Sequence, residues 1–185
     1  MLDFEYTDET PFTPAERNTL KIINNRIYTH KTLRVNYTTY DLRRAQDYLN
    51  TTTHTDFMML AHDEGSVHPY WYGRILTIFH VVVLHTGPQS KFKDPQTLQV
   101  LHVRWLGMDG EYMGGWSAKR LHRIGFVPED DPLAFGFLDP AEIIRAAHLV
   151  PAFSQGRTAS LLCPSALGRP KSDKDTDWWN FYVEM

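Results

Sequence analysis

The sequence predicts a mainly β protein with short helices, an α+β chain that forms a small bent β-barrel with an N-terminal helical extension. Residues 70–84 are dominated by Val, Ile, Phe and Tyr, which favour strands over helices. Residues 32–40 and 98–107 alternate apolar and polar side chains, as half-buried strands do. With 185 residues, 42% of them hydrophobic, we expect one globular domain over 21–185, preceded by a partly flexible extension, 1–20.

The N-terminal extension contains a helix start, TPAE. Thr13 can cap free amide groups, Pro14 suits the first turn, and Glu16 occupies the capping-box position. The pattern predicts a short helix that runs toward Asn24.

The next segments alternate between strand and helix patterns. Residues 32–40 predict a strand, because Leu33, Val35 and Tyr37 alternate with polar residues. Residues 41–49 place Leu42, Ala45 and Leu49 at helical spacing and predict a short helix. A short apolar segment, 56–61, precedes the long strand over 70–84. That strand is apolar on both faces, as expected for one that passes between two layers of a barrel.

The second half of the chain predicts further short strands. Residues 98–107 direct Leu101, Val103 and Trp105 to one face and His102 and Arg104 to a solvent-exposed face. The remaining segments are a glycine-rich turn over 108–116, a short strand over 119–127, an acidic loop over 128–132, one helical turn and a strand over 138–153, a charged linker over 171–177, and a last strand or docking segment over 177–185.

Charge and cysteine content narrow the function classes. The 22 acidic residues outnumber 19 Lys and Arg, so the net charge of -3 provides no overall basic field, and nucleic acid could bind only through a local patch. A single cysteine, Cys163, cannot form an internal disulfide, which favours an intracellular, reducing location. No apolar run approaches the ~20 residues that span a bilayer, so we expect no membrane partner.

Several long blocks of the sequence resemble a known domain. They are LRVNYTTYDLRRAQDYLN, HPYWYGRILTIFHVVVLHTGP, the VRW of LQVLHVRWLG, RLHRIGFVPEDDPLAFGFLDP, IIRAAHLVPAF and SQGRT. The resemblance is to a domain that recurs in mushroom-forming fungi (basidiomycetes), near the C-terminal end of long proteins associated with transposable elements. It covers Lys21 to Met185.

The order of elements is also distantly similar to a bromo-adjacent-homology (BAH) domain, a barrel that binds chromatin proteins. The matching segments are Tyr72 to Ile75, Val103 to Leu106 and Ile144 to Val150. Gly73 replaces the alanine of that family, and Leu106 replaces an aromatic residue. The resemblance implies a barrel of BAH or Tudor-like type, a nuclear location and a role in chromatin reading.

Four aromatic residues are the candidate ligand-binding residues: Tyr70, Trp71, Tyr72 and Trp116. They could form the walls of a cage for a methylated ammonium group, because a desolvated cation over ring faces gains ~2 kcal/mol. The alternative for Trp71, as for Trp105, is that the ring faces inward and fills the barrel. Tyr70, Tyr72 and Trp116 are flanked by loop residues and are the stronger candidates.

Two basic groups predict an alternative, nucleic-acid-binding function. They are Arg34, Arg43 and Arg44 near the start, and Lys119, Arg120 and Arg123 in AKRLHR. Either group could contact phosphates or acidic peptides, or could be ordinary solvated surface. Only convergence of both groups on one face would make a combined nucleic-acid site.

The pattern predicts no metal and no cofactor. The nine histidines form no HxxxH or HxH pair. The loop that holds His62, Asp63, Glu64 and His68 could bind a metal weakly. No GxSxG motif or glycine-rich phosphate loop is present, and the acidic residues 129–131 lie in a proline-flanked turn. A metal-dependent hydrolase or nuclease is therefore the least favoured alternative.

We therefore expect a non-catalytic protein-interaction or chromatin-reading module derived from a fungal transposable-element protein. Its partner would be a protein or a histone-type peptide, bound by the loops around residues 70–72 and 113–116. If Trp116 lines that site, Trp116→Ala should abolish peptide binding with little change in stability.

Overall fold

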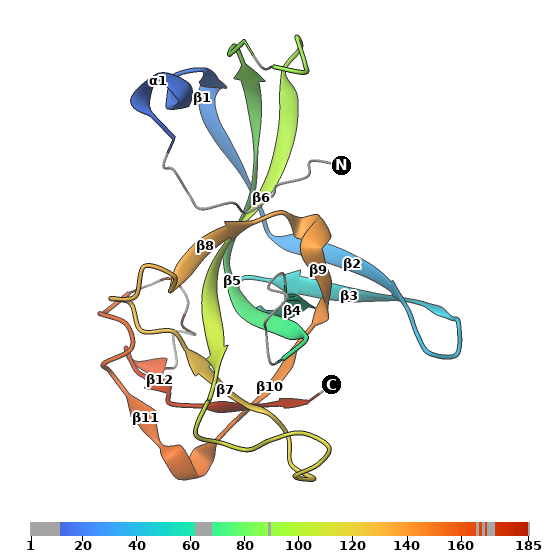
Figure 1. Cartoon of the computed structure of the whole chain (residues 1–185), viewed down its shortest axis with the longest axis vertical. Coiled ribbons are helices and arrows are strands. Elements are labelled where there is room, and N and C mark those ends of the chain that lie inside the picture. The colour runs from blue at the N-terminus through green and yellow to red at the C-terminus, as the bar shows by residue number, and fades with distance from the viewer. Residues whose placement is uncertain are drawn as a thin grey trace. The chain divides into compact units, whose positions relative to one another are not determined.

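The computed structural model describes residues 12–61, 68–88, 90–165, 167, 169 and 173–184. The fold is mainly β, with 53% of residues in strands and 7% in helices, which confirms the mainly β character that the sequence predicts (Figure 1). The sheets are not closed, so a barrel is not confirmed. The chain divides into two compact units: unit 1 contains the described residues of 12–28 and 80–98, and unit 2 those of 29–79 and 99–184. The predicted domain boundary at residue 20 stays a prediction.

Unit 1 begins with helix α1, Pro14–Arg17, and the predicted capping box is present. The Thr13 hydroxyl accepts from the Glu16 N–H, and the Glu16 carboxylate accepts from the Thr13 N–H at 2.7 Å. The predicted extension of this helix to Asn24 is wrong, because strand β1 runs over Leu20–His30. One capped turn is too short to propagate. Asn24 and Asn25 adopt left-handed φ angles of 57° and 50°, which a right-handed helix excludes.

Unit 2 contains most of an antiparallel sheet in the order β10-β13-β7-β6-β5-β4-β9. The long strands are β5 and β6, and β8 pairs with β6 beside this path. The bounds of the strands are β4, Asp56–Leu60; β5, Tyr70–His85; β6, Gln96–Met108; β7, Arg123–Phe126; β8, Phe135–Leu138; β9, Ile143–Ala146; β10, His148–Pro151; β13, Phe181–Glu184. Strands β9 and β10 follow each other along the chain, yet they lie at opposite ends of the pairing order.

Two smaller sheets complete unit 2. Strands β2, Thr32–Thr38, and β3, Arg44–Asn50, form a hairpin, and β11, Arg157–Thr158, pairs with β12, Asp177–Trp178. Two 3-10 turns, η1 at Pro140–Glu142 and η2 at Phe153–Gln155, flank β9 and β10. The strand predicted over 32–40 and the helical turn followed by a strand predicted within 138–153 are thus confirmed.

The helix predicted over residues 41–49 is wrong. Ala45, Asp47 and Leu49 point to one face of β3, and each pairs with a residue of β2. Leu42 lies in the turn with a left-handed φ of 62° and a side chain 84% exposed. Cross-strand pairing and burial of one face therefore outweigh the helical spacing of the three apolar residues.

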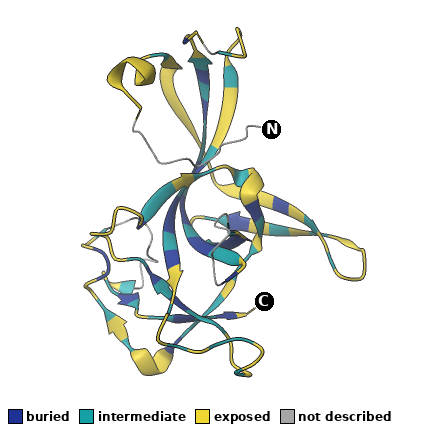
Figure 2. Cartoon of the chain, in the orientation of Figure 1, coloured by how far each residue is buried: buried dark blue, intermediate teal, exposed yellow. Residues whose placement is uncertain are grey.

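The core of unit 2 consists of two hydrophobic clusters on opposite faces of β4. Phe57 and Met59 belong to the first cluster, and Met58 belongs to the second. Figure 2 shows buried residues along β4 and β5. Strand β5 also contributes to both, Ile75 to the first and Tyr72 to the second, which confirms a strand buried on both faces. Burial of Tyr72 raises its pKa to about 12, with a smaller contribution from Tyr70.

Gly73 allows the closest packing inside this core. A Cβ atom at this position would lie 2.5 Å from Cζ of Phe57 and 3.3 Å from the Trp105 ring. Phe57 is fully buried and cannot move away without displacing its neighbours. The absence of a side chain at residue 73 is therefore what permits the Phe57 ring to cross β5 here.

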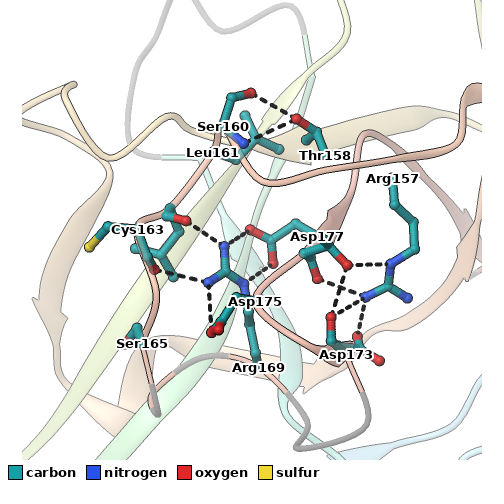
Figure 3. Close-up of polar contacts among 12 residues, drawn as sticks. Arg157, Thr158, Ser160, Leu161, Cys163, Ser165, Arg169, Asp173, Asp175 and Asp177 are labelled. Carbon is teal, nitrogen blue, oxygen red and sulfur yellow. Dashed lines mark hydrogen bonds and ion pairs between the residues drawn. The ribbon is translucent and has the colours of Figure 1, made fainter.

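A buried ion-pair network joins β6 to the C-terminal segment. Figure 3 shows the part of this network in which Arg169 contacts Asp177. The Arg104 guanidinium donates to Asp177 at 3.0 Å and to the Leu161 carbonyl at 3.2 Å. Arg169 donates to both Asp177 carboxylate oxygens, at 3.1 and 2.9 Å, and to the Leu162 carbonyl. The side chains of Arg104 and Asp177 are 0% and 2% exposed.

Two sequence predictions are corrected by this network. Arg104 does not lie on a solvent-exposed face of β6, because the Phe126 ring, 3.9 Å from the guanidinium carbon, and the segment around Leu161 cover it. Within the predicted linker 171–177, Asp173 pairs with Arg157 at 3.0 Å, and Asp177 is buried. Asp173 and Asp177 of the predicted linker therefore hold the C-terminal segment in place.

The network keeps Asp177 ionised. Burial alone would raise the pKa of the Asp177 carboxyl, but hydrogen bonds and charges from Arg169 and Arg104 together lower it. Nε and Nη1 of Arg104 have no hydrogen-bond partner among the described residues. The Phe126 ring lies over the guanidinium, and its π face compensates part of that loss.

Candidate functional site

A groove of about 590 Å³ opens on unit 2 where the ends of the sheet approach each other without closing. The groove lies between β4 and β9 on one side and β10 and β13 on the other. Its lining residues come from β4, β5, β9, β10 and β13: Met58, Leu60, Tyr70, Ile144, Arg145, Ala146, His148 and Glu184. The sheet is thus interrupted at the place where the groove forms.

A bulge in β9 shapes the groove. Met58 pairs with Arg145, but Met59 pairs with Ile143, so Ile144 is the extra residue on β9. Bulges bend a strand and redirect its side chains. Here the Ile144 side chain lines the groove instead of continuing the ladder.

The groove has an apolar floor and an exposed apolar rim. Met58 is buried in the second core cluster, and Tyr70 packs against that cluster from β5. Leu60, the cross-strand partner of Tyr70, is 58% exposed at the rim. Tyr70 is held in place by His68, whose Nδ1 lies 3.0 Å from the Tyr70 carbonyl oxygen. The floor is therefore fixed by the core, whereas Leu60 is available for contact.

Opposite charges flank this floor. His148 of β10 and Glu184 of β13 form a cross-strand pair with Nδ1 and Oε2 2.9 Å apart, and both side chains are largely exposed. Arg145 of β9 lies over the Tyr37 ring at 4.2 Å and donates to the Tyr37 hydroxyl at 3.3 Å. The groove therefore offers a carboxylate on one side and a positioned guanidinium on the other.

The two strand edges beside the groove differ in their hydrogen bonding. On β9, the Ala146 N–H donates to the Asp47 carboxylate of β3 at 2.9 Å, so a side chain already covers this edge. Strand β10 ends the pairing order and pairs with β13 alone among the described strands. An unpaired edge can accept an added strand. Of the described strand edges beside the groove, that of β10 is therefore the one left without a ladder partner.

The four predicted ligand-binding aromatics do not come together as one cage. Tyr70 lines the groove, whereas Trp71 packs in an edge contact with Trp105, 6.1 Å between ring centroids. Tyr72 is only 1% exposed and fills the core. Trp116 is 98% exposed on the loop between β6 and β7. The alternative of an inward-facing ring thus describes Trp71, whereas the burial of Tyr72 removes one of the three stronger cage candidates.

The predicted basic residues differ in their availability. Arg34 lies over the Tyr48 ring, Arg43 pairs with Asp41 at 3.0 Å, and Arg44 is the exposed first residue of β3. Lys119 and Arg120 are exposed on the loop before β7. Arg123 has a side chain 15% exposed, pairs with Asp109 at 2.7 Å and covers the Tyr112 ring.

The predicted weak metal loop falls largely outside the described residues, since His62, Asp63 and Glu64 are not among them. In the part of the chain that is described, no group of three His, Cys, Asp or Glu side chains could hold a metal ion. His68 is described and buried, with its ring 4.5 Å from that of His122.

The groove residues Arg145, His148 and Glu184 were not predicted as site residues. His148 and Glu184 lie at the ends of two short apolar segments, HLVP and FYVE, and such segments do not reveal which strands pair. The groove depends on pairing between residues 148–151 and 181–184.

Comparisons with family models, with curated proteins and with solved structures found no match for this chain. Within the described residues, no helix has the length and apolar character needed to cross a membrane.

Proposed function

We propose that the protein is a non-catalytic protein-interaction module that binds an extended segment of a partner protein in the groove between β9 and β10. The observation that carries this proposal is the combination of an unpaired strand edge with a fixed apolar floor. A bound peptide gains main-chain hydrogen bonds from the edge and side-chain specificity from the floor.

The charges beside the groove favour a peptide with a particular pattern. An apolar side chain would contact Met58 and Ile144, and a basic side chain next to it would face Glu184. Arg145 would hold an acidic side chain or the peptide carboxylate. Histone tails are extended and rich in Lys and Arg, and the resemblance to BAH domains supports a partner of this type.

The arrangement of the aromatic residues supports recognition that does not depend on lysine methylation. Tyr70 alone among the four predicted cage residues lines the groove. A single ring gives a methylated ammonium little advantage over an unmodified one. We therefore expect the groove to select sequence and extended conformation.

An array of unmodified and methylated histone-tail peptides tests the proposal, followed by fluorescence anisotropy on the strongest binder. Leu60→Ala shortens the side chain on the exposed rim and should weaken binding by at least ~10-fold, because it removes apolar contact with the peptide. Leu133→Ala is the matched control: Leu133 is 74% exposed and lies outside the groove.

Equal affinity of the two variants would contradict the groove as the binding site. A loss of binding in Trp116→Ala, with binding intact in Leu60→Ala, would also contradict it, since Trp116 is not among the groove residues. Thermal unfolding of each variant checks that a loss of binding does not follow from a loss of fold.

A further inference from the structure

The exposed face of the β2–β3 hairpin carries a pattern that the groove does not use. Three cross-strand pairs lie side by side on this face, and all six side chains are exposed: Arg34 with Tyr48, Asn36 with Gln46, and Thr38 with Arg44. The opposite face packs toward the core through residues such as Val35 and Leu49. The hairpin is therefore anchored on one face and polar on the other.

The side chains of the exposed face are held in position by one another. The Arg34 guanidinium lies 5.4 Å from the centroid of the Tyr48 ring. The Gln46 amide donates to the Asn36 side-chain oxygen at 2.6 Å. This bond uses one donor and one acceptor of the two amides, so the Asn36 amino group and the Gln46 carbonyl keep hydrogen-bonding capacity for a ligand.

The charge on this face is positive. The carboxylate of Asp47 points away from it and accepts from Ala146. Asp41 in the turn pairs with Arg43, whose side chain stays 84% exposed. Arg34 and Arg44 form no ion pair with a described residue. The exposed face thus presents guanidinium groups beside amides, without a neutralising acid between the strands.

The turn of the hairpin is held by hydrogen bonds and exposes the side chains of Tyr40 and Leu42. The Thr39 hydroxyl bonds to Asp41 and to the Arg43 carbonyl, and the Leu42 N–H donates to the Thr39 carbonyl at 2.9 Å. Within this turn Leu42 holds a left-handed φ of 62°, a conformation that non-glycine residues rarely adopt. Tyr40 is fully exposed. The turn extends away from the other strands of unit 2 (Figure 1).

We propose that the β2–β3 hairpin binds double-stranded DNA by inserting its exposed face into the major groove. A two-stranded antiparallel ribbon, with strands about 4.8 Å apart, fits the ~12 Å width of that groove. Arg34 and Arg44 would contact guanine edges or phosphates, and the pair of Asn36 and Gln46 would contact adenine. Tyr40 at the turn would contact the sugar–phosphate backbone. This proposal stands apart from the peptide groove, because no residue of this face lines the groove.

The test is fluorescence anisotropy of the full chain with a 20-base-pair DNA duplex over a salt series. Two or three phosphate contacts give a slope of log affinity against log salt of roughly −2 to −3. Arg34→Ala with Arg44→Ala should weaken binding by at least ~10-fold and reduce the slope. Lys119→Ala with Arg120→Ala removes the same charge from the other exposed basic group and should leave affinity within ~2-fold.

A second double variant tests whether the hairpin recognises the DNA bases. Asn36→Ala with Gln46→Ala should keep the salt slope and reduce discrimination between duplexes of different sequence. The proposal is overturned if the variant at Arg34 and Arg44 and the variant at Lys119 and Arg120 lose affinity equally. It is also overturned if the wild-type chain binds no DNA duplex, or if it binds duplex RNA or single strands as tightly as duplex DNA. Circular dichroism confirms that each variant keeps its strands.

Discussion

Two contacts of unit 2 between a basic and an acidic side chain differ above all in their burial. Arg104 and Asp177 pair at 3.0 Å with side chains 0% and 2% exposed, beneath Phe126. His148 and Glu184 pair at 2.9 Å with side chains 76% and 61% exposed, beside the groove. The first pair joins segments 73 residues apart, whereas the second joins two neighbouring strands.

The difference shows how burial separates structural charges from charges available for binding. Breaking a buried pair leaves an uncompensated charge in a low-dielectric interior and is strongly destabilising. An exposed pair gains little, because water solvates both partners already. Glu184, beside the groove, can therefore leave its contact with His148 and bind a ligand instead. Asp177, in the buried network, cannot.

The largest effect should come from Asp177→Ala. Removing this carboxylate leaves Arg104 and Arg169 buried near each other without their shared anion. The expected loss is about 3–5 kcal/mol in the free energy of unfolding, measured by urea denaturation. A loss below about 1 kcal/mol would show that the network is solvated in solution and would remove the contrast with the groove.

Lowering the pH should reproduce part of the loss of stability expected for Asp177→Ala. The pKa of Asp177 is lowered in the folded protein, so its contribution to stability is present above the unfolded-state pKa of about 3.9 and is lost as the pH falls through the folded pKa. Denaturation midpoints between pH 7 and pH 2 should fall more steeply at the acid end for the wild type than for Asp177→Asn. If the midpoints of the wild type and of Asp177→Asn fall in parallel with pH, the acid sensitivity belongs to other carboxyl groups.

Gly73→Ala tests apolar packing in the same interior without changing any charge. The added methyl would lie 2.5 Å from Phe57, and overpacking of this kind costs about 1–3 kcal/mol. Gly107→Ala is the matched control on β6, where the nearest atom is 3.8 Å from the new Cβ. The thermal midpoint should fall for the first variant only. Equal midpoints would mean that Phe57 moves aside freely.

Glu184→Gln should have the smallest effect on stability, below about 1 kcal/mol, because the pair with His148 is exposed. The same change should weaken binding of a Lys- and Arg-rich peptide several-fold, since it removes the carboxylate beside the groove. Thermal unfolding and anisotropy on the same sample separate the two effects. A large loss of stability with unchanged binding would reverse the roles assigned to the two pairs.

Local patterns in the sequence predicted those parts of the fold that local chemistry determines. The capping box at Thr13 and the alternation of Leu33, Val35 and Tyr37 led to the observed elements. The long strand buried on both faces was also predicted correctly.

The remaining elements depend on contacts between distant residues. The alternation in residues 98–107 predicted that Arg104 lies on the solvent-exposed face of the strand. Arg104 is instead buried, because it pairs with Asp177, 73 residues later in the chain. Ala45 and Leu49 fit a helix until β2 pairs with them. Tyr70 was the one predicted site residue that lines the groove. His148 and Glu184 were missed because they become neighbours only through the pairing of β10 with β13.

The groove is tested most directly by an NMR titration of isotope-labelled protein with the strongest-binding histone-tail peptide. We predict that amide shifts concentrate on β10 and on the lining residues Leu60, Ile144 and Glu184, with saturation at a single affinity. Shifts that concentrate instead on residues 113–116, with β10 unchanged, would contradict peptide binding in the groove.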